Sequence, residues 1–419
     1  MKKILKKFKY RKLLENYTNN INLFLNDKQN FFYIGFDPTY YTLHIGHLLA
    51  ISLINRLYKL GYKNNIIIIG GATTFISNKL NYKKIKYNIN QLKRQIYKLI
   101  INKKTIIINN FKWFKKKKFL NFIKNIFSKI SINSFLKTKL IKNKISQNKQ
   151  IDFTAFIYHL LQAYDYLYLN KKFKCSLQIG GSDQWYNILS GIKLIYKIRN
   201  ISVSGLTYPL LLNKKGLKFS KSKKYINNIW LNTKKTSSYE FYQFFINLSD
   251  QEAIKYLKLF TFLNIKKIKQ LILKHLKNKK SKIIHKYLIK FFFLWIYNKN
   301  TYKEIIKVMY ILYKKKKYKY LKKNILLLKK TLKNIKVNIN FNIYNKFTIY
   351  NLINFNKNIF KSYNEYNKFK NNNGILLINN KIIKNDILFI NKNDLILNKY
   401  IIIKKGKKNF YLLNFNNNE

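Results

Sequence analysis

The sequence predicts an α/β domain with an open, doubly wound parallel sheet, followed by an α-helical domain and a small C-terminal α+β domain. Continuous apolar runs that end in glycine, each followed by a helical pattern, predict the first domain. This succession of strand, glycine-rich turn and helix recurs three times in the first 200 residues. It is typical of sheets whose ligands bind beyond the carboxyl ends of the strands.

The first repeat begins with residues 31–36, a short predicted strand that breaks at "GFDPT". "LHIGHLLAISLINRLYKLGY" then carries apolar residues at helical spacing and stops near Gly61. "NNIIIIGGAT" has the apolar character of a strand buried on both faces, and "KCSLQIGGSDQWYNILSGIKLIYKI" repeats the plan. Residues from about 82 to 150 show helical periodicity without one acidic side chain, and we expect them to form an insertion.

The pattern changes near residue 240, which sets the predicted domain boundaries. Residues 1–240 form the α/β domain, and residues 241–335, with "SSYEFYQFFINLSDQEAIKYLKLF", form the helical one. After a linker rich in Asn and Lys, residues 345–419 shorten into strand-like pieces such as "GILLINNKII" and "DILFI".

The charge balance favours a polyanionic partner, with nucleic acid as the first candidate. Lys and Arg number 85 against 14 Asp and Glu, a formal net charge of +71. The over-used residues, Lys, Asn, Ile, Phe and Tyr, have codons rich in A and T, so genome composition explains much of this excess. Against that background glycines carry information, and ten of the twelve lie between Gly35 and Gly216. The chemistry is therefore expected in the first half of the chain.

The single cysteine, Cys175, excludes an intramolecular disulfide and fits a reducing compartment. The basic N-terminus lacks a signal-peptide core, and no run approaches 18 apolar residues. We expect a soluble, cytoplasmic protein with no membrane segment.

His44 and His47 are the first candidates for chemistry. They lie three residues apart at the start of a predicted helix, with Gly46 between them leaving the backbone open to a ligand. Because a helix N-terminus is electropositive, the pair suits a phosphate. Core packing and metal binding are the alternatives, but no further ligand of metal-site spacing accompanies the pair, so no metal site is predicted.

"KKGLKFSKSKK", residues 214–224, places Lys218 and Lys221 around serines on a polar segment, where they would grip a polyphosphate. In a chain this rich in lysine, a solvated loop is the alternative. The order of the motifs decides between the two.

In that order the chain resembles a class I aminoacyl-tRNA synthetase: "LHIGH" matches the HIGH signature, and "KFSKS" matches KMSKS with Phe for Met. It resembles the bacterial-type tyrosyl-tRNA synthetases more narrowly in "YIGFDPTYYTLHIGHL", "DFTAFIYHLLQAYDYL", "LQIGGSDQWYNI" and "KTSSYEFYQFFINLSD". The likeness covers nearly the whole chain. It implies a Rossmann-like catalytic domain that converts tyrosine and Mg²⁺-ATP into tyrosyl-adenylate and pyrophosphate, then transfers tyrosyl to the 3′ end of tRNA(Tyr), without a prosthetic group.

The resemblance also implies the roles of individual residues. The catalytic set is Thr39, His44, His47, Lys218, Lys221 and Ser222. The tyrosine-binding set is Tyr33 and Asp165 for the phenol, Tyr158 and Gln162 for the ammonium group, and Asp37, Asn78 and Gln178. The ATP-binding set is Gly35, His44, Gly46, His47, Gly180, Asp183, Gln184, Lys218 and Lys221, with Gly181 beside it. Residues 158, 162 and 165 are spaced i, i+4 and i+7, which puts them on one face of a helix.

One motif departs from the family. The pattern GGATG-x-IGDPSGK appears here as "GGATTFISNKLNY", which puts Asn78 where a substrate-binding aspartate is expected. No acidic residue between 38 and 151 can replace it, so we expect weaker tyrosine binding.

The likeness further implies a homodimer and an RNA-binding role for residues 345–419, in which Asn and Lys replace the arginines of the family. Two alternatives remain at this point. A tryptophanyl enzyme would not need the pair Tyr33 and Asp165, and a non-catalytic RNA-binding relic would explain Asn78 but not the intact signatures.

Overall fold

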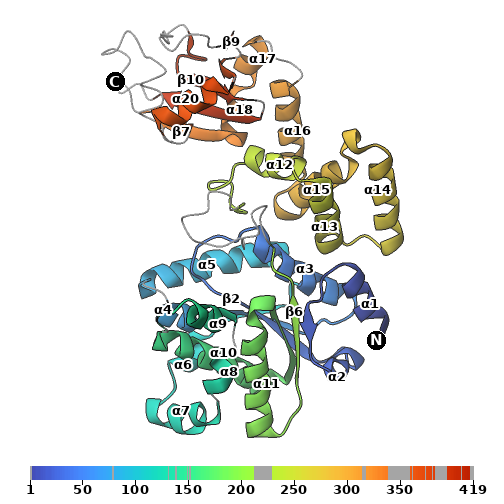
Figure 1. Ribbon diagram of the computed structural model, residues 1–419, viewed down its shortest axis with the longest axis vertical. Helices are drawn as coiled ribbons and strands as arrows, with labels where there is room; N and C mark the ends of the chain where they lie inside the picture. Colours follow the sequence, from blue (N-terminus) through green and yellow to red (C-terminus); the bar gives the residue numbers. More distant parts are fainter. Residues whose placement is uncertain are drawn as a thin grey trace. The chain divides into compact units, whose positions relative to one another are not determined.

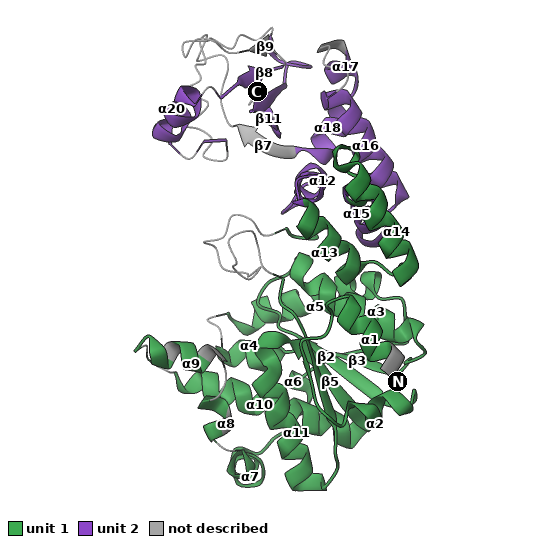
Figure 2. Cartoon of the chain, turned by 45° about the vertical axis from the view of Figure 1, so that its right-hand side comes forward, with its two compact units in different colours: residues 1–231, 250–284 green, residues 232–249, 285–419 purple. Residues whose placement is uncertain are grey.

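The computed structural model describes residues 2–77, 80–130, 132–136, 139–148, 150, 152–211, 229–313, 318–337, 359–360, 362–372, 374–379, 381–382, 394–406 and 408–415. The chain divides into two compact units, Met1–Leu231 with Asp250–Ile284 (unit 1) and Asn232–Ser249 with His285–Glu419 (unit 2), coloured separately in Figure 2. The division into domains 1–240, 241–335 and 345–419 remains a prediction.

Unit 1 contains the predicted open α/β sheet (Figure 1). Its strands, in the spatial order β1-β6-β5-β2-β3-β4, are β1 (Asn16–Tyr17), β6 (Ser204–Tyr208), β5 (Cys175–Gly181), β2 (Phe31–Phe36), β3 (Asn65–Ile69) and β4 (Ile106–Asn109). The strands from β6 to β4 pair in parallel, and β1 pairs antiparallel with β6 at the edge. The chain leaves β2 toward β3 on one side and later adds β5 and β6 on the other. The strand order therefore reverses between β2 and β5, where ligands bind in doubly wound sheets.

The helices of unit 1 are α1 (Lys2–Tyr10), α2 (Ile21–Asn26), α3 (Ile45–Lys59), α4 (Gly71–Ser77), α5 (Tyr82–Leu99), α6 (Phe111–Phe114), α7 (Phe119–Asn125), α8 (Ile132–Leu136), α9 (Lys139–Ser146), α10 (Phe153–Phe173), α11 (Trp185–Arg199), α13 (Asp250–Phe260) and α14 (Ile265–Lys277), with the short 3₁₀ turns η1 (Phe127–Lys129), η2 (Ser182–Gln184) and η3 (Lys279–Ser281). One face of the sheet, with Tyr33 and Ile66, packs in a common core with Tyr166 of α10 and Leu194 of α11. Helix α3 ends as predicted, because Gly61 follows it with φ at +99°.

Part of the segment predicted as an insertion belongs to the sheet. Strand β4 pairs in parallel with β3, with Ile106 opposite Ile66. The four residues of β4 lie in "TIIINN", an apolar run too short to stand out in a segment where isoleucine is everywhere. The sheet therefore extends into the region from 82 to 150.

Unit 2 combines helices with a second sheet. Its elements are α12 (Ser238–Ile246), α15 (Ile283–Ile296, which begins just before the unit), α16 (Lys299–Tyr313), α17 (Tyr318–Lys323), α18 (Ile325–Thr331) and α20 (Tyr363–Asn371), and a five-stranded sheet in the order β7-β11-β10-β8-β9, with β7 (Lys333–Val337), β11 (Asn409–Phe415), β10 (Tyr400–Lys405), β8 (Leu376–Ile378) and β9 (Lys381–Ile382). Strand β7 precedes the expected boundary at 345 but pairs with β11, so the small sheet recruits it from the helical segment. The predicted strand "DILFI" lies outside the described residues.

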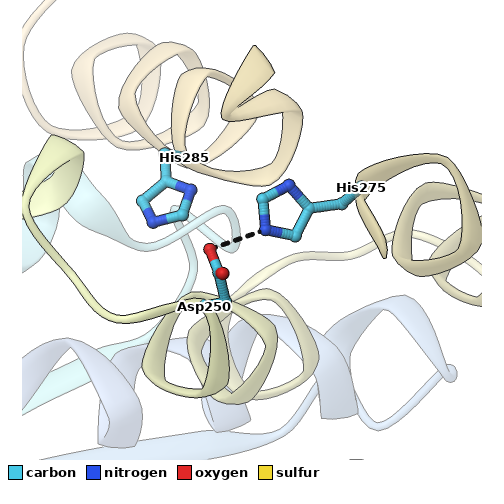
Figure 3. A group of neighbouring side chains, drawn as sticks. All are labelled: Asp250, His275 and His285. Atoms are coloured by element: carbon cyan, nitrogen blue, oxygen red, sulfur yellow. Dashed lines mark hydrogen bonds and ion pairs between the residues drawn. The ribbon is translucent and has the colours of Figure 1, made fainter. Parts of the chain in front are cut away.

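Within the described ranges, no helix has both the length and the apolar character needed to cross a lipid bilayer. Three histidines outside the predicted site, His159, His275 and His285, are buried. In unit 1 His275 Nε2 bonds Asp250 Oδ1 at 2.9 Å (Figure 3), and in unit 2 His285 Nε2 bonds the carbonyl oxygen of Leu248 at 2.9 Å. These two rings have structural partners.

Candidate active site

A cavity of about 340 Å³ opens at the carboxyl ends of β2, β3, β5 and β6, at the point where the strand order reverses. Most of the predicted site residues line it: Tyr33, Gly35, Asp37, His44, Gly46, His47, Tyr158, Gln162, Asp165, Gln178, Gly180, Gly181, Asp183 and Gln184. Residues far apart in the sequence thus converge because parallel strands present their carboxyl ends at one edge.

Five predicted residues are not among the described residues that line the cavity. Thr39 is among the described residues, where its Oγ1 is buried and has no hydrogen-bond partner. Asn78, Lys218, Lys221 and Ser222 lie outside the described residues, so their positions remain predictions.

Tyr33 and Asp165 form one end of the cavity. The Tyr33 hydroxyl is buried without a hydrogen-bond partner among the described residues, although such groups are normally paired. Asp165 Oδ1 accepts a hydrogen bond from Trp113 Nε1 at 2.9 Å, and its Oδ2 accepts one from Asn110 Nδ2 at 3.1 Å. Burial raises the pKa of Asp165 to about 8, and these two donors hold the pKa below what burial alone would give. This end fits a ligand hydroxyl that bonds both residues.

A second polar group surrounds Asp37, directly after β2. The Tyr158 hydroxyl donates to Asp37 Oδ2 at 3.0 Å, and Thr73 Oγ1 lies 3.5 Å from Asp37 Oδ1. Burial first, and then the Asp37 charge, raise the pKa of Tyr158 well above its usual value. A Cβ atom on Gly70 would come within 2.7 Å of Asp37 Oδ1, so glycine keeps room for this carboxylate. The site therefore offers an anionic partner to a ligand cation.

The two histidines cap helix α3 and are held by backbone groups. Gly46 N donates to His44 Nδ1 at 3.1 Å, and His44 N donates to His47 Nδ1 at 3.0 Å. Because both Nδ1 atoms are acceptors, each neutral ring carries its proton on Nε2. The ring centroids are 3.8 Å apart, at the electropositive end of the helix. The arrangement presents two N–H donors suited to an anion.

Glycines form part of the cavity wall. A Cβ atom on Gly35 would meet nothing within 4 Å, so a larger residue there would extend toward the cavity. A Cβ atom on Gly181 would come within 2.7 Å of Asp183 Oδ1. Glycine at these positions leaves space for a ligand and for the Asp183 carboxylate.

Several residues of the site escaped prediction. Asn110 and Trp113 bond Asp165 from the segment predicted as an insertion, and Thr73 lines the cavity from α4. Asn187 of α11 bonds both Gln162 and Gln184. Thr73 and Asn110 each follow closely on a strand, a position that could have marked them as candidates.

Comparison with known proteins finds one family model, described as tRNA synthetases class I (W and Y), which matches residues 25–307. The tyrosine–tRNA ligase of Wigglesworthia glossinidia brevipalpis is 42% identical over 286 residues, 65% of this chain and 67% of that protein. The tyrosine–tRNA ligase of Aster yellows witches'-broom phytoplasma (strain AYWB) is 34% identical over 418 residues, 97% and 98% of the two chains. Among solved structures, the C-terminally truncated mitochondrial tyrosyl-tRNA synthetase of Aspergillus nidulans superposes with a TM-score of 0.64 at 25% identity, covering 73% of this chain and 93% of that one.

Proposed function

The chain belongs to the class I tRNA synthetases of the tryptophan and tyrosine group, in the bacterial tyrosyl branch, and we propose that the cavity of unit 1 is where it activates tyrosine. It is a tyrosine–tRNA ligase, which uses ATP to form tyrosyl-adenylate and then charges tRNA(Tyr). The observation that carries the assignment of the site is the buried Tyr33 hydroxyl, which lies beside Asp165 and has no hydrogen-bond partner among the described residues. Charging of tRNA(Tyr) with labelled tyrosine tests the function, and absence of charging would contradict it.

The proposed pose places the substrate phenol between Tyr33 and Asp165. Its ammonium group then lies toward Asp37, Tyr158 and Gln162, which offer oxygen acceptors and a negative charge. Gln178 lines the same part of the cavity, and its Oε1 is buried without a partner among the described residues. Buried polar atoms without protein partners are expected where a ligand completes them.

In the proposed first step, a tyrosine carboxylate oxygen attacks the α-phosphorus of ATP, and the bond to pyrophosphate breaks. We propose that ATP arrives as its Mg²⁺ complex. Gly35, Gly46, Gly180, Asp183 and Gln184 are proposed to hold the nucleotide. His44 and His47 donate from Nε2 to the phosphates, aided by Thr39 and by the segment bearing Lys218, Lys221 and Ser222. Catalysis is then positioning and stabilisation of charge developing on the leaving pyrophosphate, with no covalent enzyme intermediate.

Asn78 is proposed to contact tyrosine where the family has an aspartate. We expect Asn78→Asp to lower the KM for tyrosine about fivefold, since a charge-assisted hydrogen bond is stronger than a neutral one by about 1 kcal/mol. The measurement is tyrosine-dependent ATP–pyrophosphate exchange, with the KM for ATP as control. An unchanged or raised KM for tyrosine would remove Asn78 from the binding set.

The sheet of unit 2 is proposed to bind tRNA through lysines. Not every lysine there is available, because Lys405 Nζ bonds Glu365 Oε1 at 3.0 Å and lies 3.7 Å from the ring centroid of Phe360. We expect deletion of residues 333–419, which removes β7 together with its partner β11, to weaken tRNA charging while pyrophosphate exchange persists. Charging by the full chain should fall steeply with added salt. Charging that survives the deletion would contradict the RNA-binding role.

We propose that the chain forms a homodimer through the segment from α7 to the start of α10. Phe119, Leu120 and Phe153 are 72, 76 and 71% exposed, unusual for apolar side chains of this size. We expect the double substitution Phe119→Asp and Leu120→Asp to yield a monomer in sedimentation velocity measurements, since buried charges oppose association. A monomeric unsubstituted chain would contradict the proposal.

A cytoplasmic location is proposed as well, because the tRNA and ATP of a bacterial cell are in its cytoplasm.

A further inference from the structure

Asn187 forms hydrogen bonds to two residues that line the cavity. Its Nδ2 donates to Gln162 Oε1 of α10 at 2.9 Å and to Gln184 Oε1 of η2 at 2.9 Å. Its Oδ1 bonds His159 Nδ1 at 2.7 Å. Both glutamines line the cavity, whereas Asn187 and His159 are not among the described residues that do. One amide thus holds two residues that face the ligands.

We propose that Asn187 is a positioning residue for tyrosine activation, which orients Gln162 toward the amino acid and Gln184 toward the nucleotide. The inference rests on the proposed function, because it takes the ligands of these two glutamines from that assignment. Nothing in the sequence motifs singled out Asn187, since asparagine is abundant throughout the chain. The proposal comes from the three hydrogen bonds alone.

The amide of Asn187 can take only one orientation in this network. Burial lowers the pKa of His159, which favours a neutral ring with one N–H group. With that proton on Nδ1, the ring donates to Asn187 Oδ1, and the two N–H bonds of Nδ2 must then point to the glutamines. Each glutamine in turn has its Oε1 on the side of Asn187 and its Nε2 on the other arm of the planar amide.

Few side chains could replace this asparagine. Aspartate has the same shape but no N–H donor, and its charge would face two carbonyl oxygens. Alanine would leave both glutamines free to change rotamer, and a ligand would have to order them again at the cost of affinity. Loss of the shared donor should therefore weaken two different ligands at once.

The experiment is ATP–pyrophosphate exchange by the full chain carrying Asn187→Ala or Asn187→Asp. We expect the KM for tyrosine and the KM for ATP each to rise about threefold to tenfold, with kcat changed by less than about threefold, as for the loss of one hydrogen bond per ligand. Ser190→Ala is the matched control. Ser190 lies one turn along the same helix, where its Oγ donates to the Tyr186 carbonyl oxygen at 3.0 Å, and both KM values should stay unchanged.

Double-mutant cycles separate positioning from a general loss of structure. In a Gln162→Ala background, Asn187→Ala should no longer raise the KM for tyrosine but should still raise that for ATP. In a Gln184→Ala background, Asn187→Ala should no longer raise the KM for ATP but should still raise that for tyrosine. If Asn187→Ala raised both KM values equally in every background, or if Ser190→Ala raised them as much as Asn187→Ala does, the inference would be overturned and the proposed function would still stand. Absence of tyrosine-dependent exchange in the unsubstituted chain would overturn both.

Discussion

His44→Asn lowers the kcat of tyrosine-dependent ATP–pyrophosphate exchange by about 10²- to 10³-fold and leaves the KM for tyrosine within about twofold. The reason is that His44 Nε2 is proposed to donate to charge that develops on the phosphates in the transition state. Removing one such preorganised donor typically costs this much in rate. The tyrosine end of the cavity, around Tyr33 and Asp165, is built from other elements and is not disturbed.

The asparagine variant is chosen because His44 also caps helix α3. Asparagine keeps an acceptor for the Gly46 N–H group, whereas alanine loses it, at a cost of about 1 kcal/mol in stability. We therefore expect His44→Asn and His44→Ala to lose kcat alike but to differ in Tm. If kcat followed Tm across the two variants, the histidine would have only a structural role.

The second large effect is expected at Asp165. Measured above about pH 8, where the Asp165 carboxyl is ionised, Asp165→Asn should raise the KM for tyrosine roughly 10- to 100-fold, as for losing a hydrogen bond to a charged group. The low kcat/KM for phenylalanine should not change. The ratio of kcat/KM for tyrosine to that for phenylalanine should therefore fall by the same factor. Tyrosyl-tRNA synthetases are themselves the standard example of sites that reject phenylalanine through a hydroxyl contact. Exchange kinetics with both amino acids provide the measurement.

Tyr33→Phe is the graded control, because it removes a neutral hydroxyl in place of a carboxyl. It should raise the KM for tyrosine by about two- to tenfold only. If Tyr33→Phe and Asp165→Asn both left the KM unchanged, the phenol would not lie at this end of the cavity.

The pH dependence of stability provides an independent check on Asp165. Its pKa is about 8 in the folded chain against the ordinary 3.8, so between these values the folded chain holds a proton that the unfolded chain has released. Stability contributed by this group therefore falls as the pH rises from about 4 to 8. In Asp165→Asn this loss should be absent, and the Tm of the unsubstituted chain relative to that of the variant should decline across the window.

The sequence was sufficient for the parts of the fold with strong local patterns. Strands β2, β3 and β5 were predicted because apolar runs end in glycine or in "GFDPT", and helix α3 because it follows such a run and ends at Gly61. Strand β4 was missed because four isoleucine-rich residues do not differ from their surroundings. Strand β7 was missed because its partner β11 lies at the far end of the chain.

The residues of the candidate site were likewise predictable only in part. Its ligand-facing residues belong to contiguous motifs, so a resemblance could identify them. The residues that hold them in place do not: Asn110 and Trp113 lie 55 and 52 positions from Asp165, and Asn187 lies 25 positions from Gln162. Single hydrogen bonds across such separations leave no periodic trace in one sequence, and only the folded chain brings the partners together.

The most direct test of the central claim is ATP–pyrophosphate exchange by the purified chain with tyrosine, phenylalanine and tryptophan in parallel. We expect exchange with tyrosine alone, because only tyrosine brings a hydroxyl to Tyr33 and Asp165 within an intact activation site. Exchange that favours tryptophan would contradict the assignment of the pocket. No exchange with any of the three, in a chain that still binds tRNA, would contradict tyrosine activation and identify an RNA-binding protein.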